Sequence, residues 1–267
     1  MNKSSIGEQF EELINIVKRL RGPDGCPWDK DQTSDSLVSY MLEEAYEVIE
    51  AIDDKNWDGL KEELGDLIFH IVFQATIAKE NKIFDISESL KNINEKLVRR
   101  HPHVFDKKNV SKNNIKPNWE LQKHKEKERN SRLDGVPSNL PGLIRAQRIQ
   151  EKASYVGFDF QREEDIWEKI SEEIEELKYA QEKNNKDEIL EELGDTIFSL
   201  VNLARFLDIS ADDALRKSNN KFINRFKMIE NELNKRGKNI EESSLNELDD
   251  IWNSIRWASR ACLFLCL

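Results

Sequence analysis

The segment EELGDLIFHIV occupies residues 62–72, and a close copy, EELGDTIFSLV, occupies residues 191–201. An acidic segment precedes each copy: EEAYE at residues 43–47 and EEIEE at residues 172–176. Both later segments lie 129 residues after their counterparts, so the gap between the two motifs is the same in both halves of the chain. Two motifs repeated at one offset indicate a duplicated structural unit.

Each copy lies in a segment whose apolar residues recur at helical spacing. Apolar side chains at i, i+3, i+4 and i+7 form one stripe along a helix. Such a stripe runs through residues 41–52 and again through residues 60–71, and no segment shows the alternation of a β-strand. The sequence therefore predicts an all-α fold of tandem duplicated helical bundles. The expected helices span residues 6–21, 35–53, 58–80, 87–100, 119–133, 143–154, 163–183, 187–207, 211–235 and 245–257.

Residues at the expected helix ends agree with this prediction. Ser5 and Ser210 stand where a hydroxyl group accepts a hydrogen bond from the first turn of a helix. Gly237 stands just past the expected end of a helix, where glycine is favoured.

The duplicated motifs and a breaker loop, DGVPSNLPG at residues 134–142, suggest the domain boundaries. We expect an N-terminal domain at 1–105, a polar and helical linker at 106–142, a C-terminal domain at 143–257 and an atypical tail at 258–267.

The composition limits the classes of function. The 267 residues include 41 Lys and Arg against 52 Asp and Glu, a net charge of −11, so we expect no stable nucleic-acid binding. Three cysteines without a C-x-x-C pair are not typical of a secreted disulfide scaffold or a zinc site. A signal-peptide core is absent, and no apolar run approaches the roughly 20 residues that cross a bilayer. We therefore expect a cytoplasmic protein with no membrane association.

The acidic motifs predict a cluster of four carboxylates. Residues three apart on a helix share one face, so Glu44 neighbours Glu47 and Glu63 neighbours Asp66. The short link at residues 54–58 favours antiparallel pairing of the two helices, which brings the four groups together. Four uncompensated carboxylates repel one another, and hard divalent cations relieve that repulsion. The pattern indicates a magnesium site, with manganese as the alternative.

The second copy repeats this pattern, and its four metal-ligand candidates are Glu173, Glu176, Glu192 and Asp195. Acidic residues at helical spacing are commonly a solvated face, but such a face requires neither a conserved gap nor placement beside an apolar stripe. Di-iron bundles use Glu-x-x-His, and none of the four histidines has a glutamate three residues before it. His70 shares the face of Glu63 and Asp66; because magnesium sites rarely use imidazole, we interpret it as a packed polar residue.

These motifs resemble the all-α nucleoside triphosphate pyrophosphohydrolases, and the tandem arrangement resembles the MazG family. The similarity covers nearly the whole chain and includes GPDGCPWDKDQT (22–33), RRHPHVF (99–105), LPGLIRAQRIQEKASYVGFDF (140–160) and GDTIFSLVNLARFL (194–207). The resemblance implies MazG-like domains that hydrolyse nucleoside triphosphates to monophosphate and pyrophosphate with magnesium. It also implies a homodimer in which helices of both subunits build the site, and a role in housecleaning or nucleotide-pool control.

Differences between the two copies favour the C-terminal one as the catalyst. Lys169, one turn before Glu173, replaces Tyr40 of the first copy. Asn202 replaces Phe73 on the second helix of the pair. The second copy thus adds a cation and an amide near its carboxylates. We interpret the first site, formed by Glu44, Glu47, Glu63 and Asp66, as weak or inactive.

Phosphate groups require cationic donors as well as metal. Lys221 and Arg225 stand one turn apart in KFINRF and present two cations to one side of a helix. The resemblance places triphosphate-binding residues there, and it places Trp252 against the nucleotide. The predicted substrate-binding residues are Lys169, Glu188, Asn202, Lys221, Arg225 and Trp252.

The hypothesis for the reaction is attack of a metal-activated water on the phosphorus of the α/β-anhydride. Glu172 and Glu191, which directly precede the metal-ligand candidates Glu173 and Glu192 in the sequence, are the candidates for accepting the proton of that water. A narrower enzyme for dUTP and dCTP or for a phosphoribosyl nucleotide remains an alternative, because such relatives share the carboxylate motif. A non-catalytic helical regulator that binds nucleotide is an alternative from a different class.

Overall fold

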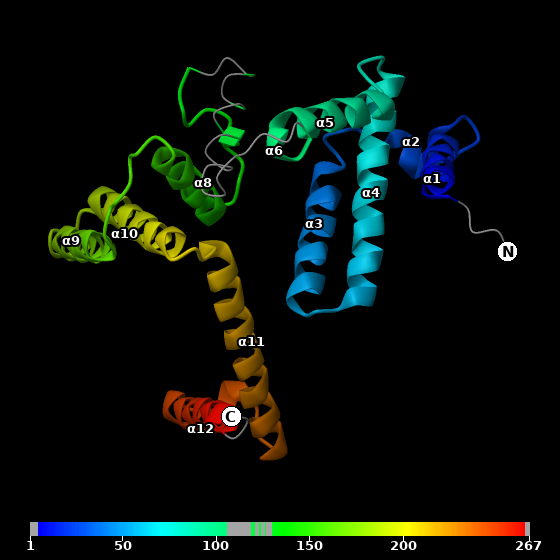
Figure 1. Cartoon of the computed structure of the whole chain (residues 1–267). Helices are drawn as coiled ribbons and strands as arrows, with labels where there is room; N and C mark the ends of the chain where they lie inside the picture. Colours follow the sequence, from blue (N-terminus) through cyan, green and yellow to red (C-terminus); the bar gives the residue numbers. More distant parts are fainter. Residues whose placement is uncertain (1–4, 106–118, 121–122, 124–125, 127–129, 265–267) are drawn as a thin grey trace. The chain divides into compact units, whose positions relative to one another are not determined.

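The structure, a computed structural model, is all-α in its described part (Figure 1), as predicted, and no strand occurs there. The chain divides into two compact units, residues 1–112 and 113–267. The described residues are 5–105, 119–120, 123, 126 and 130–264.

The first unit contains six described helices. They are α1 (Ile6–Arg21), α2 (Pro27–Asp31), α3 (Val38–Asp53), α4 (Trp57–Glu80), α5 (Ile86–Arg100) and α6 (Pro102–Phe105). Helices α3 and α4 lie side by side, joined by a short link (Figure 1). The core gathers Val17 of α1, Leu37, and Val72, Phe73 and Ile77 of α4, and Phe10, Leu13 and Ile14 pack against it. The apolar stripe expected for the first helix is therefore what joins α1 to α4.

The second unit repeats the helix pair and adds two further helices. Its elements are α8 (Gly142–Ser154), α9 (Glu163–Glu182), α10 (Lys186–Phe206), α11 (Ala211–Lys235), a 3₁₀ turn at Ile240–Glu242 and α12 (Leu245–Phe264). Helix α10 packs against both α9 and α8. One buried cluster joins Ile166 and Ile170 of α9 to Leu203 of α10. A second joins Ile229 and Leu233 of α11 to Ile251 of α12.

The predicted helix ends are confirmed at three positions. The Ser5 hydroxyl accepts a hydrogen bond from the backbone N–H of Glu8, whose carboxylate accepts the Ser5 N–H in return. The Ser210 hydroxyl accepts from Asp213 N–H at the start of α11. Gly237 adopts a φ of +69° just past α11, a conformation that glycine reaches without strain.

Four details of the prediction were wrong. The short helices α2 and α6 were missed; each begins at a proline, which fits the first position of a helix. The helix expected at 119–133 ends before residues 130–133, which form a bend and a turn. Helix α3 begins at Val38 because the preceding residues form a turn, and α12 continues to Phe264, into the expected tail. The other residues of the expected linker helix, 121–122, 124–125 and 127–129, lie outside the described residues, as do 106–118 and 265–267.

The described part of the linker is attached to α8 by buried charges. Glu120 is buried and forms ion pairs with Arg148 and Lys152, the latter at 3.3 Å. Lys152 is also buried, and its Nζ donates a hydrogen bond of 3.0 Å to the backbone oxygen of Arg132. Burial by itself would raise the pKa of Glu120, but the surrounding cations lower it. These contacts place this part of the linker in the second unit.

The described helices include none that combines the length and the apolar character needed to cross a membrane.

Candidate metal centres

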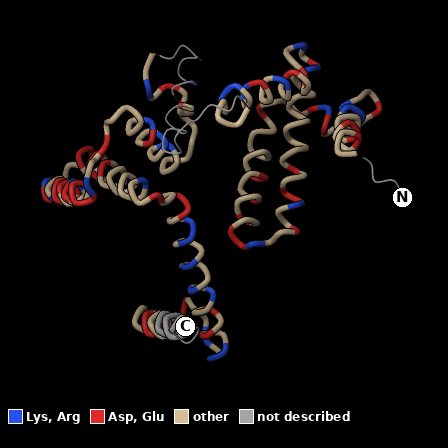
Figure 2. Tube along the Cα trace, viewed as in Figure 1, with Lys and Arg blue, Asp and Glu red and all other residues tan. Residues whose placement is uncertain are grey.

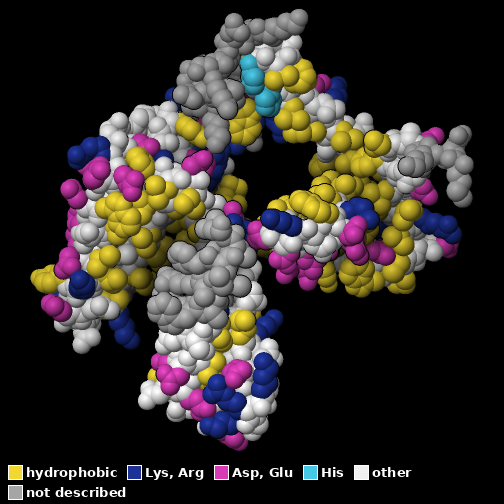
Figure 3. All heavy atoms as spheres, turned by 60° about the horizontal axis from the view of Figure 1, so that its bottom comes forward, with side chains coloured by type: hydrophobic (Ala, Val, Ile, Leu, Met, Phe, Trp, Pro, Cys, Tyr) yellow, Lys and Arg dark blue, Asp and Glu magenta, His cyan; other side chains and the backbone are white. Residues whose placement is uncertain are grey.

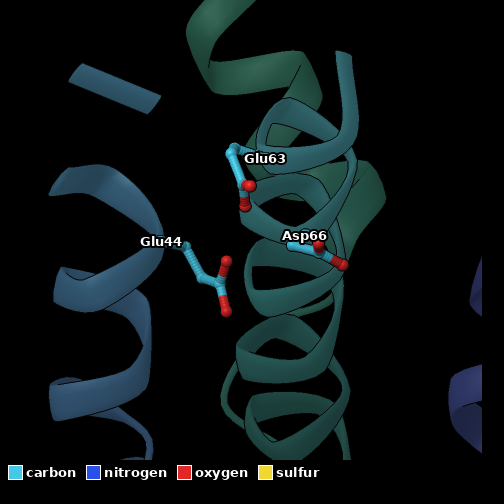
Figure 4. A group of neighbouring side chains, drawn as sticks. All are labelled: Glu44, Glu63 and Asp66. Carbon is cyan, nitrogen blue, oxygen red and sulfur yellow. The ribbon is translucent and has the colours of Figure 1, made fainter. Parts of the chain in front are cut away.

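In the first unit, three of the four predicted carboxylates converge between α3 and α4. Glu44 points from α3 toward α4, which carries Glu63 and Asp66 (Figure 4). Ligand oxygens of these three residues all lie within 4.8 Å of one another. Glu47 is exposed, but its charge raises the pKa values of both Glu44 and Glu63, so it faces the same group.

The second unit repeats this convergence between α9 and α10 with a slightly different set. Ligand oxygens of Glu173, Glu176 and Glu192 lie within 4.8 Å of one another. Glu173 is 5% exposed, so one carboxylate of the cluster is buried. Asp195 is exposed and acts on Glu192 through its charge. In each unit, therefore, three carboxylates lie close together and a fourth acts on them through its charge.

Matching hairpin links set this geometry in both units. Lys55 and Asn184, 129 residues apart, adopt positive φ angles of 55° and 54°. The next residue in each case is an asparagine that caps the second helix: Asn56 accepts from Gly59 N–H, and Asn185 accepts from Asp187 N–H. The same turn followed by the same type of cap brings the two helices of each pair into the same register.

The electrostatics of both clusters favour a bound cation. Burial and the neighbouring carboxylates of Asp66, Glu47 and Glu63 raise the pKa of Glu44. The pKa of Glu63 is raised in the same way. In the second unit, burial, Glu176, Glu173 and Asp195 together raise the pKa of Glu192.

A raised carboxyl pKa means that negative charge is unfavourable at that position in the folded protein. Oxygen-only ligands of this kind suit hard divalent cations. Both clusters are therefore able to hold a metal ion.

Lys169 distinguishes the second cluster from the first. Its Nζ lies 2.8 Å from Glu173 Oε1 and 2.9 Å from Glu172 Oε1. The hydrogen bonds to Glu173 and Glu172 raise the pKa of Lys169, which keeps the ammonium group charged. At the equivalent position in the first unit, Tyr40 instead stacks on His70, with ring centroids 6.5 Å apart. The prediction of a cation beside the second cluster thus has a geometric basis.

Asn202 lines a cavity of about 440 Å³ beside α10 rather than contacting the carboxylates by hydrogen bonds. Its Oδ1 accepts hydrogen bonds from Arg205 at 2.7 and 3.2 Å, and Arg205 also pairs with Asp159. Phe198 and Phe160 supply part of the apolar lining. The role of Arg205 and Asp159 was missed, because nothing in a local pattern relates two residues 46 positions apart.

The cationic and aromatic candidates in the last two helices form their own group. Lys and Arg are spaced along α11, whereas Asp and Glu gather on α9 (Figure 2). The Arg225 guanidinium lies 5.5 Å from the centre of the Trp252 ring, which also contacts Phe222. Within the described part of the chain, neither Lys221 nor Arg225 forms an ion pair or hydrogen bond with the acidic cluster. The structure thus brings Arg225 and Trp252 together but does not join them to the carboxylates.

The remaining predicted residues border the second cluster to different degrees. Glu172 is directed to Lys169 by the 2.9 Å hydrogen bond and its side chain is 57% exposed. Glu191 is exposed and raises the pKa of Glu192 through its charge. Glu188 lies 3.8 Å from Lys183 at the start of α10. Of the two proton-acceptor candidates, Glu172 is hydrogen-bonded to Lys169, which also contacts the metal-ligand candidate Glu173.

The fold and these sites define an all-α protein in which a duplicated helix pair carries two acidic, cation-type sites. The family model described as the MazG nucleotide pyrophosphohydrolase domain matches residues 32–105 and 161–229. The chain belongs to the MazG family. The two matched segments each contain one acidic helix pair, which confirms both the resemblance and the tandem arrangement predicted from the sequence.

Relatives with similar sequences span most of the chain. It is 46% identical over 252 residues to the nucleoside triphosphate pyrophosphohydrolase/pyrophosphatase MazG of Thermotoga maritima, covering 94% of this chain and 96% of that protein. It is 40% identical over 255 residues to the nucleoside triphosphate pyrophosphohydrolase of Escherichia coli K12, covering 93% and 97%. The nucleoside triphosphate pyrophosphohydrolase of Mycobacterium tuberculosis is 35% identical over 156 residues, 58% of this chain and 47% of that protein.

Proposed function

We propose that this protein hydrolyses nucleoside triphosphates to nucleoside monophosphate and pyrophosphate, and that the second unit performs the reaction with Mg²⁺. The observation that carries the proposal is the convergence of Glu173, Glu176 and Glu192 beside the charged side chain of Lys169. Membership of the MazG family and the names of the similar proteins support the same reaction. Hydrolysis breaks the bond between the bridging oxygen and one phosphorus of the α/β-anhydride. The hydroxyl group of water joins that phosphorus, and the remaining proton goes to the other product or to the solvent.

The donor set of the second cluster fits magnesium, with manganese as the alternative, because it consists of carboxylate oxygens alone. A bound Mg²⁺ would supply positive charge to the phosphate oxygens and lower the pKa of a coordinated water. Glu173, Glu176, Glu192 and Asp195 would hold it.

Lys169 would donate to a phosphate oxygen and stabilise the charge that develops there. Glu172, held beside Lys169 at 2.9 Å, would accept the proton of the attacking water.

The remaining substrate contacts follow from the second unit's other polar groups. Asn202 would reach the nucleotide from the cavity that it lines beside α10. Arg225 would contact the phosphates, and Trp252, whose ring lies beside Arg225, would contact the nucleotide. Because neither residue forms a hydrogen bond or ion pair with the acidic cluster of its own chain, within the part that the structure describes, we expect a second subunit to bring such a pair to each site.

The experiment is pyrophosphate release with Mg²⁺, measured across the eight common ribo- and deoxyribonucleoside triphosphates. The matched variants are Glu176→Ala and Glu47→Ala, which change equivalent positions of the two clusters, both of them exposed. We expect Glu176→Ala to abolish release and Glu47→Ala to retain it. The reverse pattern would assign the reaction to the first unit. Activity confined to one or two nucleotides would identify a narrower enzyme, and no release with any nucleotide would identify a non-catalytic protein.

We further propose that the protein is a homodimer. Each helix pair leaves an apolar stripe uncovered at equivalent positions of α4 and α10, exposed by 42% to 48%. The positions are Leu64, Ile68 and Ile71 on α4, and Leu193, Ile197 and Leu200 on α10. Apolar side chains gather in patches on the visible surface of both units (Figure 3). Continuous apolar patches of this kind mark association surfaces.

Sedimentation of the full chain tests the dimer. We expect the wild-type protein to sediment as a dimer and Ile197→Glu to shift it toward monomer, because a buried charge at the interface is costly. Ile83→Glu is the control, since Ile83 is 70% exposed and lies outside both stripes. A monomeric wild-type protein would contradict the proposal.

A further inference from the structure

The cavity beside α10 in the second unit has the size and the walls of a small-molecule site. Its volume is about 440 Å³, and residues of α8, of α10 and of the loop between α8 and α9 line it. Cavities that bind small molecules measure roughly 300–1,000 Å³ and combine apolar walls with a few polar groups. The walls here include Phe158, Phe160 and Phe198. Phe158 is 82% exposed, so its ring is available to stack on a flat ligand.

The carboxamide of Asn202, which lines this cavity, is fixed with its amino group free. Its Oδ1 accepts hydrogen bonds from Arg205 at 2.7 and 3.2 Å. An arginine only donates, so the atom that faces it must be the oxygen. Arg205 is held in turn by its ion pair with Asp159. Among the described residues Asn202 Nδ2 has no hydrogen-bond partner, and the free end of this side chain is therefore a donor.

Gln150 lines the same cavity and has the opposite free end. Its Nε2 donates a hydrogen bond of 2.8 Å to the backbone oxygen of Phe198, and the residue is 6% exposed. Its Oε1 is buried and has no hydrogen-bond partner in the described part of the chain. A buried acceptor without a donor is costly and requires a physical explanation. The cavity thus has one unused donor and one unused acceptor on its walls.

Helix α10 connects this cavity to the acidic cluster. Asn202 follows Asp195 by seven residues, so the two side chains lie on nearly the same face, about 10.5 Å apart along the helix axis. The equivalent residue of the first unit, Phe73, is fully buried in the core of that unit. A nucleotide whose phosphates lie at the second cluster can therefore extend along α10 to the cavity.

We propose that this cavity binds the base of the nucleoside triphosphate. Asn202 Nδ2 donates to a carbonyl oxygen or ring nitrogen of the base, Gln150 Oε1 accepts from an N–H group of the base, and Phe158 stacks on the ring. Proteins that enclose a single base read it in this way, by hydrogen bonds to its edge and by stacking. Arg205 is a positioning residue, because its bonds to Oδ1 determine which end of the Asn202 carboxamide is free. This inference rests on the proposed hydrolysis of nucleoside triphosphates.

The test compares two probes by calorimetric titration of the full chain with Mg²⁺ present. The first probe is the α,β-methylene analogue of ATP, and in parallel that of UTP; the carbon bridge prevents cleavage, so binding is measured whether or not the protein is an enzyme. The second is inorganic tripolyphosphate, which has the phosphates but no base. We expect Phe158→Ala and Asn202→Leu to lower the affinity for the analogues by about fivefold or more, as loss of one base-stacking ring does. The affinity for tripolyphosphate should change by less than about twofold.

Arg205→Met should cause the same selective loss, whereas a purely structural role of Arg205 would lower the affinities for both probes alike. Phe84→Ala is the matched control and should change neither affinity, because Phe84 is an exposed phenylalanine of the first unit and lies outside the cavity. Circular dichroism and urea unfolding identify any variant that no longer folds. Phe158 has little contact to lose, so its variant remains informative if the others unfold.

The proposal is overturned if folded Phe158→Ala and Asn202→Leu proteins lose affinity for both probes equally or for neither. It is also overturned if Phe158→Ala leaves analogue binding unchanged and shifts the protein toward monomer in sedimentation, since a second subunit would then cover the cavity. Pyrophosphate release by the wild-type protein tests the reaction separately. Release together with unselective variants would overturn only the base site, and selective analogue binding without release would overturn only the reaction.

Discussion

Replacing Lys169 with methionine tests how its ammonium group affects metal binding and catalysis at the second cluster. The Lys169 Nζ lies 2.8 Å from Glu173 Oε1, and a Mg²⁺ ion bound to that carboxylate would lie about 2.1 Å from the oxygen. The ammonium group and the ion would then be at most about 4.9 Å apart. Lys169→Met removes one positive charge at this distance and keeps a side chain of similar length.

The expected change in affinity follows from Coulomb's law. The Lys169 side chain is 38% exposed, and the dielectric constant of water gives a lower limit to the interaction. Charges of +1 and +2 at about 4.9 Å then repel by about 1.7 kcal/mol. At about 0.15 M salt roughly half of this repulsion remains. In the absence of nucleotide, Lys169→Met should therefore bind Mg²⁺ about fivefold to twentyfold more tightly than the wild-type protein.

Catalysis should change in the opposite direction, because the phosphate groups lose a donor. We expect the turnover number for nucleoside triphosphates to fall by about 10²-fold or more, in line with the loss of one donor to developing charge. The two opposed effects separate a role in charge balance from a general loss of structure.

The assay is calorimetric titration with Mg²⁺ in a Glu44→Gln background, which removes a ligand of the first cluster. Lys178→Met is the matched control, because Lys178 pairs with Glu175 at 2.7 Å on the same helix but lies outside the cluster. Unchanged or weaker Mg²⁺ binding by Lys169→Met, with an unchanged control, would refute the reasoning.

Three further predictions concern stability. The folded-state pKa of Glu192 is raised, so the folded protein holds this proton more tightly than the unfolded chain does. Without metal, the stability of the wild-type protein relative to Glu192→Gln should therefore fall as pH rises above about 4.3. Urea unfolding midpoints at pH 4, 6 and 8 measure this fall. Excess Mg²⁺ should cancel the advantage of Glu192→Gln, and an advantage that is constant with pH would contradict the prediction. Lys152→Met leaves Glu120 with one fewer buried cation and should destabilise the second unit by about 3 kcal/mol. The control, Lys178→Met, should cost less than about 1 kcal/mol. Equal unfolding midpoints of the two variants would count against a stabilising role of the buried pair. Phe73→Ala empties a fully buried position in the first unit and should cost about 3–5 kcal/mol in urea unfolding, so a loss below 1 kcal/mol would show that this core is not tightly packed.

The fold class and the two acidic clusters were predictable from the sequence because both depend on local regularities. A helix places residues three or four apart on one face whatever surrounds it. The offset of 129 residues showed that one such arrangement occurs twice. Most long helices were located for the same reason, since an apolar stripe of helical period persists over many residues. The missed helices are the two short ones, α2 and α6, which have too few residues to show a period.

The fine structure of the sites was decided by contacts between helices. The two links share the same turn and the same type of cap, yet Asp66, rather than Glu47, completes the closest group in the first unit. Glu176, rather than Asp195, does so in the second.

Residues distant in the sequence also meet only through the fold. Arg205 reaches Asp159 across 46 positions, and Tyr40 of α3 stacks on the buried His70 ring of α4. The sequence by itself determined which residues share a helix face, because that follows from the 3.6-residue period of one helix. Only the tertiary structure decided which faces meet and which charges are buried there, because those depend on the turns and packing between helices.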